Sequence, residues 1–250
     1  MQCLDYPFPS PAELLAADEA LLDRAEAGHG GELLAFWEPH ATFVVVGYAN
    51  QVAVEVNPAA CTAAGVPIFR RCSGGGTVVQ MPGGLNYSLI LRITESGPTR
   101  NISAANQFIM EKNRVAIQAA LGPGANEVSV RGHTDLALAP RGVPHPVLRK
   151  FAGNAQRRRR QFLLFHGTLL LNCDLPRIAE LLPMPSAQPD YRADRPHDAF
   201  VTNLNLPAAT VKAALAQAWE ATPGGDALPL ADIHRLAQEK YATPAWNYKF

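Results

Sequence analysis

Hydrophobic and polar residues follow two different periods along this chain, and each period predicts its own kind of element. Apolar side chains recur at helical spacing within residues 11–27 and 103–121, so both segments are predicted to be amphipathic helices. Ser10 as N-cap and Pro11 in the first turn mark the start of the first helix. The second helix is expected to carry on or near one face the side chains of Phe108, Val115, Ile117 and Leu121.

The remaining segments are shorter. Apolar, β-branched or alternating runs predict strands at residues 33–37, 42–47, 66–71, 77–80, 85–93, 127–131, 136–138, 147–151 and 162–172. Further helices are predicted at residues 57–65, 175–182, 207–221 and 232–241. Residues 183–196 contain four prolines and are predicted to be a surface loop, and a Pro/Gly-rich link is expected at 223–229.

This order of elements predicts the fold class. Hairpin-like strands flanked by a few helices favour an α+β fold with a mostly antiparallel sheet. The chain shows no internal repeat, and no break in composition before about Pro183 indicates a second domain, so residues 1–250 are predicted to form a single domain.

Composition and charge narrow the functional classes. The 250 residues are 48% hydrophobic and 18% charged, with a formal net charge of zero, so no overall field attracts nucleic acid or an anionic membrane. Apolar runs are of strand length, too short to span a membrane, and the N-terminus lacks the pattern of a signal peptide. The spacing of the four cysteines fits neither a zinc knuckle nor a CxxC redox pair. A cytoplasmic protein is expected.

The strongest candidate for chemistry is a run of three glycines, Gly74 to Gly76, which follows Arg70 and Arg71. Bare backbone lets successive N–H groups converge on an anion. Neighbouring side chains of a strand point to opposite faces, so only one arginine should reach the site, and Arg71 is the expected one. The run is neither a Walker loop nor a dinucleotide-binding GxGxxG motif. A simple hairpin turn is the alternative.

Three further features have both a functional and a plain interpretation. Lys150, in an apolar strand, could neutralise a carboxylate that attacks a phosphate, or it could be an exposed edge lysine. His166 and Gly167 interrupt an apolar strand, so His166 either lines an acyl pocket or is buried and bonded to backbone. The four arginines at 157–160 are a solvated hairpin tip or a docking site for an acidic partner.

Four motifs in order resemble those of one family. Residues 70–78 (RRCSGGGTV) look like the RRxSGGGxV signature of lipoate–protein ligases, and residues 150–155 (KFAGNA) look like the lysine loop of that family. Residues 166–172 (HGTLLLN) and 132–136 (GHTDL) are similar to its HGTLLLN strand and GRNDL turn. The resemblance runs from about residue 12 to the C-terminus.

The resemblance implies the catalytic-domain fold shared by biotin and lipoate ligases. Such enzymes activate lipoate or octanoate with ATP and Mg²⁺ to give acyl-AMP, then transfer the acyl group to a lysine of a lipoyl carrier domain or a glycine-cleavage H-type protein. By position, Lys150 would be catalytic and would contact both nucleotide and acyl group. The other nucleotide contacts implied are Arg71, Gly76, Thr77, Val78, Val79 and Asp135. The other acyl contacts implied are Trp37, Ser73, Gly74, Gly75, Gly153, His166 and Gly167. No metal ligands are expected.

Departures from the family pattern leave alternatives open. Gln80 stands where the family usually has histidine, and the chain ends at Phe250, so no C-terminal accessory domain is expected and a companion subunit could supply its role. Lys240-Tyr241-Ala242 and Trp246-Asn247-Tyr248 are similar to the end of octanoyltransferases, which work through a cysteine thioester. Residues 126–134 hold no cysteine, and Cys72 and Cys173 are interpreted as structural, which favours a ligase. A non-catalytic, carrier-binding paralogue is the third hypothesis.

Overall fold

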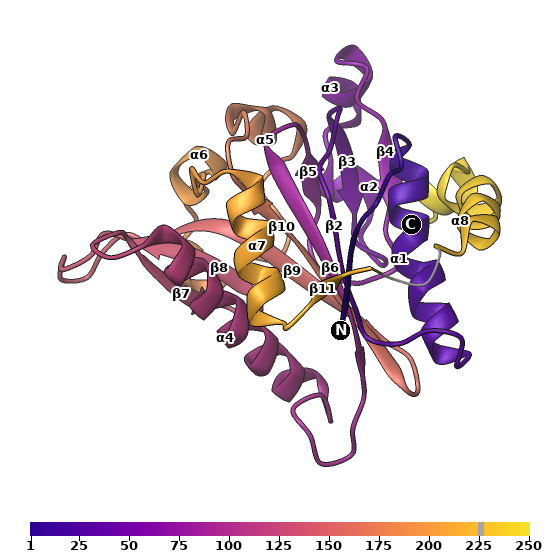
Figure 1. The fold of residues 1–250 in the computed structure, drawn as a ribbon. Helices are drawn as coiled ribbons and strands as arrows, with labels where there is room; N and C mark the ends of the chain where they lie inside the picture. The colour runs from indigo at the N-terminus through magenta and orange to yellow at the C-terminus, as the bar shows by residue number, and fades with distance from the viewer. Residues whose placement is uncertain (225–227) are drawn as a thin grey trace.

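The computed structural model describes residues 1–224 and 228–250, and a large, mostly antiparallel sheet organises them (Figure 1). The sheet has eight strands in the order β11-β1-β2-β6-β10-β9-β8-β7, and only β1 pairs in parallel, with β2 and β11. The strands are β1 (Gln2–Asp5), β2 (Leu33–Trp37), β6 (Gly84–Arg92), β7 (Glu127–Arg131), β8 (Asp135–Ala139), β9 (Arg149–Arg158), β10 (Phe162–Leu170) and β11 (Thr222–Pro223). The predicted α+β class is confirmed, although the pattern had not indicated β1.

A second, small sheet carries the glycine run. Its strands are β3 (Phe43–Val46), β4 (Ile68–Arg70) and β5 (Val78–Gln80), in the order β4-β3-β5. The glycines join β4 to β5, yet each of these strands pairs with β3, one parallel and one antiparallel. The alternative of a simple hairpin turn is therefore wrong, because the turn crosses over β3 instead of joining neighbouring strands.

Helices cover both faces of the large sheet (Figure 1). Helices α4 (Ile102–Leu121) and α7 (Ala208–Ala218) pack on one face, against a core that includes Leu34 and Phe36. Helices α1 (Pro11–Glu26) and α8 (Leu230–Leu236) pack on the other face, where Ala35 and Trp37 point. The alternation of β2 residues between two cores follows from the strand period of two.

Shorter helical segments fill the connections. They are α2 (Val52–Glu55), α3 (Pro58–Ala63), α5 (Pro176–Leu181), α6 (His197–Phe200), α9 (Pro244–Asn247), the 3₁₀ turn η1 (Asp190–Arg192) and the π-helical turn η2 (Ala237–Tyr241). The helix predicted at 232–241 is thus α8 continued by a π turn. The link predicted at 223–229 falls partly outside the described residues. Val115 is 51% exposed, so its expected place on the apolar face of α4 is wrong.

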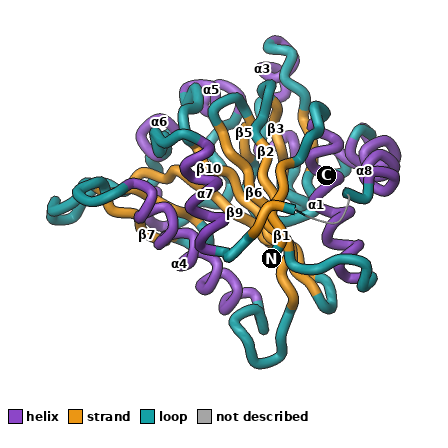
Figure 2. Tube along the Cα trace, viewed as in Figure 1, coloured by secondary structure: helices purple, strands orange, loops and turns teal. Residues whose placement is uncertain are grey.

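Two segments differ from the sequence prediction in ways that matter for the site. The strand expected at 147–151 is β9, which continues to Arg158, so residues 150–155 lie in a strand paired with β8 and β10 and not in a loop (Figure 2). Residues 183–196 contain η1 and a buried Arg192, so they are more than a surface loop.

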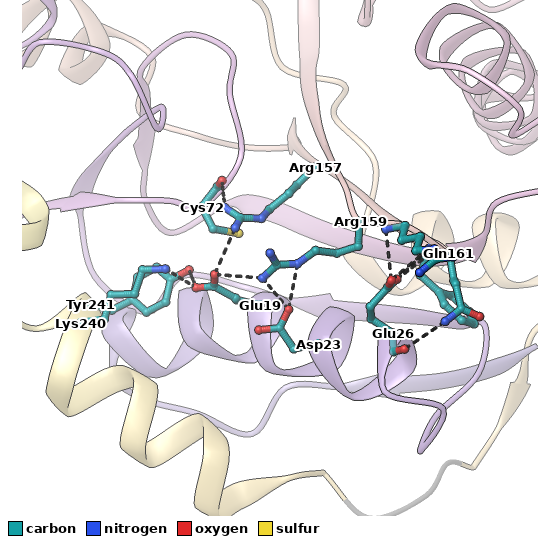
Figure 3. Close-up of polar contacts among 11 residues, drawn as sticks. Glu19, Asp23, Glu26, Cys72, Arg157, Arg159, Gln161, Lys240 and Tyr241 are labelled. Carbon is teal, nitrogen blue, oxygen red and sulfur yellow. Dashed lines mark hydrogen bonds and ion pairs between the residues drawn. The ribbon is translucent and has the colours of Figure 1, made fainter.

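Charged side chains tie α1 to the β9–β10 hairpin and to the C-terminal segment (Figure 3). Glu19, 4% exposed, lies 2.6 Å from Lys240 Nζ, accepts a hydrogen bond from Tyr241 Oη and pairs with Arg157 and Arg159. Arg157 also donates to the carbonyl of Cys72, at the edge of the glycine turn.

These contacts bear on the two interpretations of the arginine run. Arg157 and Arg159 fold back onto the helix, and Arg158 donates to the carbonyl of Thr99. Three of the four arginines therefore already have partners within the chain. This argues against both interpretations, the solvated hairpin tip and the docking site for an acidic partner.

No helix in the described ranges has the length and apolar content needed to cross a membrane.

Candidate functional site

A cavity of about 940 Å³ lies between the glycine turn of the small sheet and the face of the large sheet. Strands β5, β6, β9 and β10, the β7–β8 turn, and residues 182–192 contribute to its lining. The cavity is mostly preformed by strands, which favours a fixed arrangement of polar groups.

Most of the residues singled out from the sequence meet in this cavity. Those that line it are Trp37, Arg71, Gly75, Gly76, Thr77, Val78, Val79, Asp135, Lys150, Gly153, His166 and Gly167. Ser73 and Gly74 are not among the lining residues, and Ser73 is only 1% exposed. Ser73 contacts His166, which does line the cavity.

The two arginines point to opposite sides, as the strand period predicts. Arg70 is fully buried, and its guanidinium donates to the carbonyls of Gly47, Tyr48, Asn50, Trp246 and Asn247. It ties residues 47–50 to the C-terminal segment and does not line the cavity. Arg71 is the one that does.

Arg71 is a buried cation held by the turn that it precedes. Its Nη2 donates to the carbonyls of Gly74 and Gly76 at 2.6 Å each, and its Nε donates to Ser73 Oγ at 3.1 Å. Burial lowers its pKa to about 10, so the guanidinium stays charged at neutral pH. No described carboxylate lies within ion-pair distance of it, and Nη1 has only a 3.4 Å contact to the carbonyl of Val45. The arrangement leaves positive charge facing the cavity.

The turn depends on glycine where backbone approaches backbone. Gly75 has φ +83°, in the left-handed region that side chains rarely adopt. A Cβ at Gly47 would collide with the carbonyl oxygen of Gly75. These two positions let the turn fold tightly over β3.

Lys150 has a carboxylate partner inside the cavity. Its Nζ lies 2.7 Å from Asp135 Oδ1, and the hydroxyl of Tyr191 donates to Asp135 Oδ2 at 2.8 Å. Burial, together with the charge of Asp135, raises the pKa of Tyr191 far above its usual range, so Tyr191 remains a donor. A Cβ at Gly153 would lie 2.9 Å from Lys150 Nζ, so glycine makes room for the ammonium. The plain interpretation of Lys150 as an exposed edge lysine is wrong.

His166 bonds to side chains on both sides. Its Nε2 lies 2.5 Å from Ser73 Oγ, and its Nδ1 lies 2.6 Å from Asp18 Oδ2. Asp18 also accepts hydrogen bonds from Tyr6 and Ser88. The expectation of a histidine bonded to backbone is therefore wrong, and His166 lies at the cavity wall.

Gln80 belongs to a closed polar cluster. It exchanges two amide hydrogen bonds with Asn86, and both side chains contact the hydroxyl of Thr168 at 2.6–2.8 Å. All three residues line the cavity. The amide of Gln80 is satisfied without an ionisable ring at this position.

The four cysteines are not placed for catalysis. None of them lines the cavity, and Cys61, Cys72 and Cys173 are buried. Burial raises the pKa of Cys72 to about 12 and that of Cys173 to about 11. Such thiols are poor nucleophiles at neutral pH, which agrees with their interpretation as structural.

Several cavity residues had not been identified from the sequence. Tyr191 comes from the proline-rich segment, and Asp18 comes from α1. Asp18 had one available signal, since a charged residue surrounded by Ala16, Ala17 and Ala20 on a helix calls for a buried partner. Tyr191 had none, because only the fold brings it to Asp135.

Fold and cavity together place a buried cation, Arg71, at a glycine turn beside the cavity. A sequence profile described as the lipoyl protein ligase A/B catalytic domain matches residues 10–220. The chain belongs to this family.

Its relatives carry the names of two different activities. Octanoyltransferase LipM of Carboxydothermus hydrogenoformans is 26% identical over 99% of this chain and 98% of its own length. A putative lipoate-protein ligase A of Aeropyrum pernix is 31% identical over 69% of this chain and 58% of its own length.

Solved structures support the fold. The bi-partite lipoate protein ligase of Thermoplasma acidophilum superposes with a TM-score of 0.78 and 22% identity, covering 99% of this chain and 95% of that one. A lipoate-protein ligase A bound with ATP gives a TM-score of 0.75 and 20% identity, covering 99% and 98%.

Proposed function

We propose that this protein is a lipoate–protein ligase, which activates lipoate or octanoate with ATP and transfers the acyl group to a carrier lysine. The observation that supports it best is a pair of cations, Arg71 and Lys150, that line one cavity. Arg71 has no described carboxylate partner there, so the cavity is suited to an anionic substrate. A mixed anhydride of a carboxylic acid and adenylate has the charge and the size for it.

The proposed reaction has two steps. In the first, an oxygen of the acyl carboxylate attacks the α-phosphorus of ATP, a new P–O bond forms, and pyrophosphate leaves with the electrons of the broken P–O bond. In the second, the neutral amine of the carrier lysine attacks the acyl carbonyl, the C–O bond to AMP breaks, and the amine loses its proton. The chain itself forms no covalent bond to the acyl group.

The proposal assigns roles to the lining residues. Lys150 neutralises charge at the acyl carbonyl and the α-phosphate as the anhydride forms. Arg71 and the backbone of residues 76–79 hold the nucleotide, with Asp135 near the phosphates. Trp37, Gly153 and Gly167 shape the acyl side, where Trp37 stacks on Phe43 at 6.3 Å between ring centroids.

Mg²⁺ is expected to arrive bound to the phosphates of ATP. The described residues contain no group of three histidine, cysteine or acidic side chains that could hold a metal ion. Mg²⁺ commonly takes most of its ligands from phosphate and water, so such an ion needs no protein cage. Asp135 is the carboxylate proposed near the phosphates, and its two oxygens are bonded to Lys150 and Tyr191.

A lipoyl carrier domain or an H-type carrier is the proposed protein partner. The bi-partite ligase with a similar fold is described with its E2 lipoyl domain. We infer a cytoplasmic reaction.

The test combines wild-type protein with lipoate, ATP, Mg²⁺ and an apo lipoyl domain. We expect acyl-AMP, pyrophosphate and a carrier heavier by one lipoyl group, detected by mass spectrometry. Lys150→Ala should lower acyl-AMP formation by a factor on the order of 10²–10³ while the protein stays folded. Lys112→Ala is the matched control, since Lys112 lies on α4 against Trp219. An unchanged rate for Lys150→Ala would contradict the assignment.

An octanoyltransferase is the second candidate, and one observation favours it: octanoyltransferase LipM matches this chain over nearly the full length of both. Such an enzyme would accept octanoyl carrier as donor without ATP and would form a thioester on a cysteine. The burial of Cys72 and Cys173 argues against it. Transfer from octanoyl carrier in the absence of ATP, with a trapped acyl-cysteine, would replace the ligase proposal. Carrier binding without either reaction would indicate a non-catalytic paralogue.

A further inference from the structure

A chain of hydrogen bonds joins a buried carboxylate of α1 to the cation at the glycine turn. It runs from Arg71 Nε to Ser73 Oγ at 3.1 Å, from Ser73 Oγ to His166 Nε2 at 2.5 Å, and from His166 Nδ1 to Asp18 Oδ2 at 2.6 Å. Its four members are nearly out of contact with solvent: Arg71 is 8% exposed, Ser73 1% and Asp18 3%, and the side chain of His166 is 12% exposed.

The chemistry of Asp18 determines which atom donates in its hydrogen bond with His166. Asp18 can only accept as a carboxylate, and its Oδ1 already accepts from Tyr6 and Ser88, so His166 Nδ1 carries a proton and donates to Oδ2. Ser73 Oγ accepts from Arg71 and shares its other hydrogen bond with His166 Nε2. The chain therefore places a protonated Nδ1 of His166 against the carboxylate of Asp18.

The constellation has the residue types of a serine-hydrolase triad, but its placement differs. Ser73 does not line the cavity, and its oxygen is already the acceptor for Arg71. An acyl carbonyl in the cavity would meet His166 before it met Ser73. The geometry therefore favours positioning over nucleophilic attack.

The hydrogen-bond chain also brings negative charge close to the buried Arg71. A carboxylate in direct contact would stabilise the buried guanidinium, yet it would occupy the same donors that an anionic substrate needs. Asp18 acts from two side chains away, so it supplies negative charge and orientation while Nη1 stays almost free. Hydrogen bonds in series polarise one another, which strengthens this coupling in a buried site.

We propose that Asp18, acting through His166 and Ser73, is a positioning residue that holds the Arg71 guanidinium in the orientation that receives an oxyanion of the substrate. The inference rests on the proposed function, because it assumes that Arg71 binds a phosphate or carboxylate group. It adds a residue of α1 to the determinants of that site.

The first test uses kinetics of acyl-AMP formation. Asp18→Asn and Ser73→Ala should each lower kcat by about tenfold or more, with a smaller change in KM for ATP, since misoriented charge acts mainly on the transition state. In a double-mutant cycle, the kcat of the variant with both Asp18→Asn and Ser73→Ala should lie within about twofold of that of Ser73→Ala alone, because both changes break the same hydrogen-bond chain. Ser73→Thr keeps the hydroxyl and should recover most of the rate. Multiplicative losses in the double variant would overturn the proposal.

A matched control separates positioning from support of the fold. Tyr6→Phe removes one hydrogen bond from Asp18 Oδ1 but leaves the chain to Arg71 intact, and Tyr6 does not line the cavity. It should lower Tm and leave kcat unchanged. If Tyr6→Phe slows the reaction as much as Ser73→Ala does, Asp18 has only a structural role. Should Asp18→Asn fail to fold, Ser73→Ala carries the comparison, because it removes only one small hydroxyl.

A second readout needs no turnover. In protein labelled with ¹⁵N-histidine, His166 should show a protonated Nδ1 that is hydrogen-bonded to a carboxylate, with His166→Gln used to assign the signals. Calorimetry with inorganic pyrophosphate and, separately, with octanoate shows which oxyanion Arg71 holds, and Ser73→Ala should weaken one of them. A ring without a proton on Nδ1, or unchanged affinities for both probes, would contradict the inference. If the wild-type protein makes no acyl-AMP but these readouts hold, the proposed function fails and the positioning chain stands.

Discussion

Lys150 Nζ and Asp135 Oδ1 lie 2.7 Å apart inside the cavity, and Gly153 leaves the space in which they meet. A Cβ at position 153 would lie 2.9 Å from the ammonium nitrogen and 3.0 Å from Lys150 Cε. The lysine side chain would have to move, although the backbone of residue 153 does not need glycine for its φ. The position of the Lys150 ammonium beside Asp135 therefore depends on glycine at residue 153.

We accordingly predict that Gly153→Ala slows acyl-AMP formation by about tenfold to 100-fold, because a shift of 1 Å in a catalytic group can cost that much. Steady-state release of pyrophosphate measures the effect. Gly31→Ala is the control, since nothing lies within 4 Å of a Cβ there and the residue does not line the cavity. Equal rates for wild type and Gly153→Ala would show that the position of the ammonium does not limit the reaction.

Glu19 should make the stability of the protein sensitive to acid. Burial raises the pKa of its carboxyl, but hydrogen bonds from Lys240 and Tyr241 and the charge of Arg157 outweigh burial and bring the pKa below its usual 4.5. A carboxyl with a lowered pKa in the folded state contributes stability above its unfolded pKa, and this contribution is lost as the pH falls through the folded value.

The free energy of unfolding in urea, measured from neutral pH to below 4.5, should therefore fall less steeply for Glu19→Gln than for wild type. Glu180→Gln serves as the comparison, because Glu180 pairs only with Arg177 on the surface of α5. Parallel curves for Glu19→Gln and wild type would argue against this cluster as a source of acid sensitivity.

The buried cysteines should be unreactive in the folded protein. With pKa values of about 12 and about 11, Cys72 and Cys173 hold almost no thiolate at neutral pH. Iodoacetamide should label neither, as read by peptide mass spectrometry, whereas all four cysteines should react in denaturant. Rapid alkylation of native Cys72, prevented by octanoyl substrate, would instead point to a thioester mechanism.

Asn247 should be a strong contributor to stability. Its Oδ1 accepts from the backbone N–H of Arg70 at 2.9 Å, its Nδ2 donates to the carbonyl of Tyr241 at 2.9 Å, and it is 5% exposed. Asn247→Ala leaves two buried backbone groups without partners, so we expect a loss on the order of 1–3 kcal/mol in urea unfolding. Asn126→Ala, at an exposed position, should change stability by less than about 0.5 kcal/mol. A loss that small for Asn247→Ala would mean that water replaces these bonds.

Much of the site could be foreseen because its signals are local. The glycine run, the lysine of KFAGNA and the strand around His166 are each visible within ten residues, and the strand period of two correctly separated Arg71 from Arg70. The helical period gave α1 and α4 to within one residue at each end. The local pattern predicted strand ends less well where a strand is polar and resembles a loop. In β9, the glycine and asparagine at 153–154 interrupt the apolar pattern, so the strand was predicted too short.

The amino-acid sequence by itself determined the element types, the mostly antiparallel α+β class and the presence of a cation beside a glycine turn, since each depends on neighbours along the chain. Only the tertiary structure decided that the turn crosses over β3, that Tyr191 reaches Asp135, and that Asp18 is linked through His166 to Ser73. Asp18 and His166 are 148 residues apart. Such contacts arise when whole elements pack. No local period in the sequence encodes which buried polar groups will then form hydrogen bonds with each other.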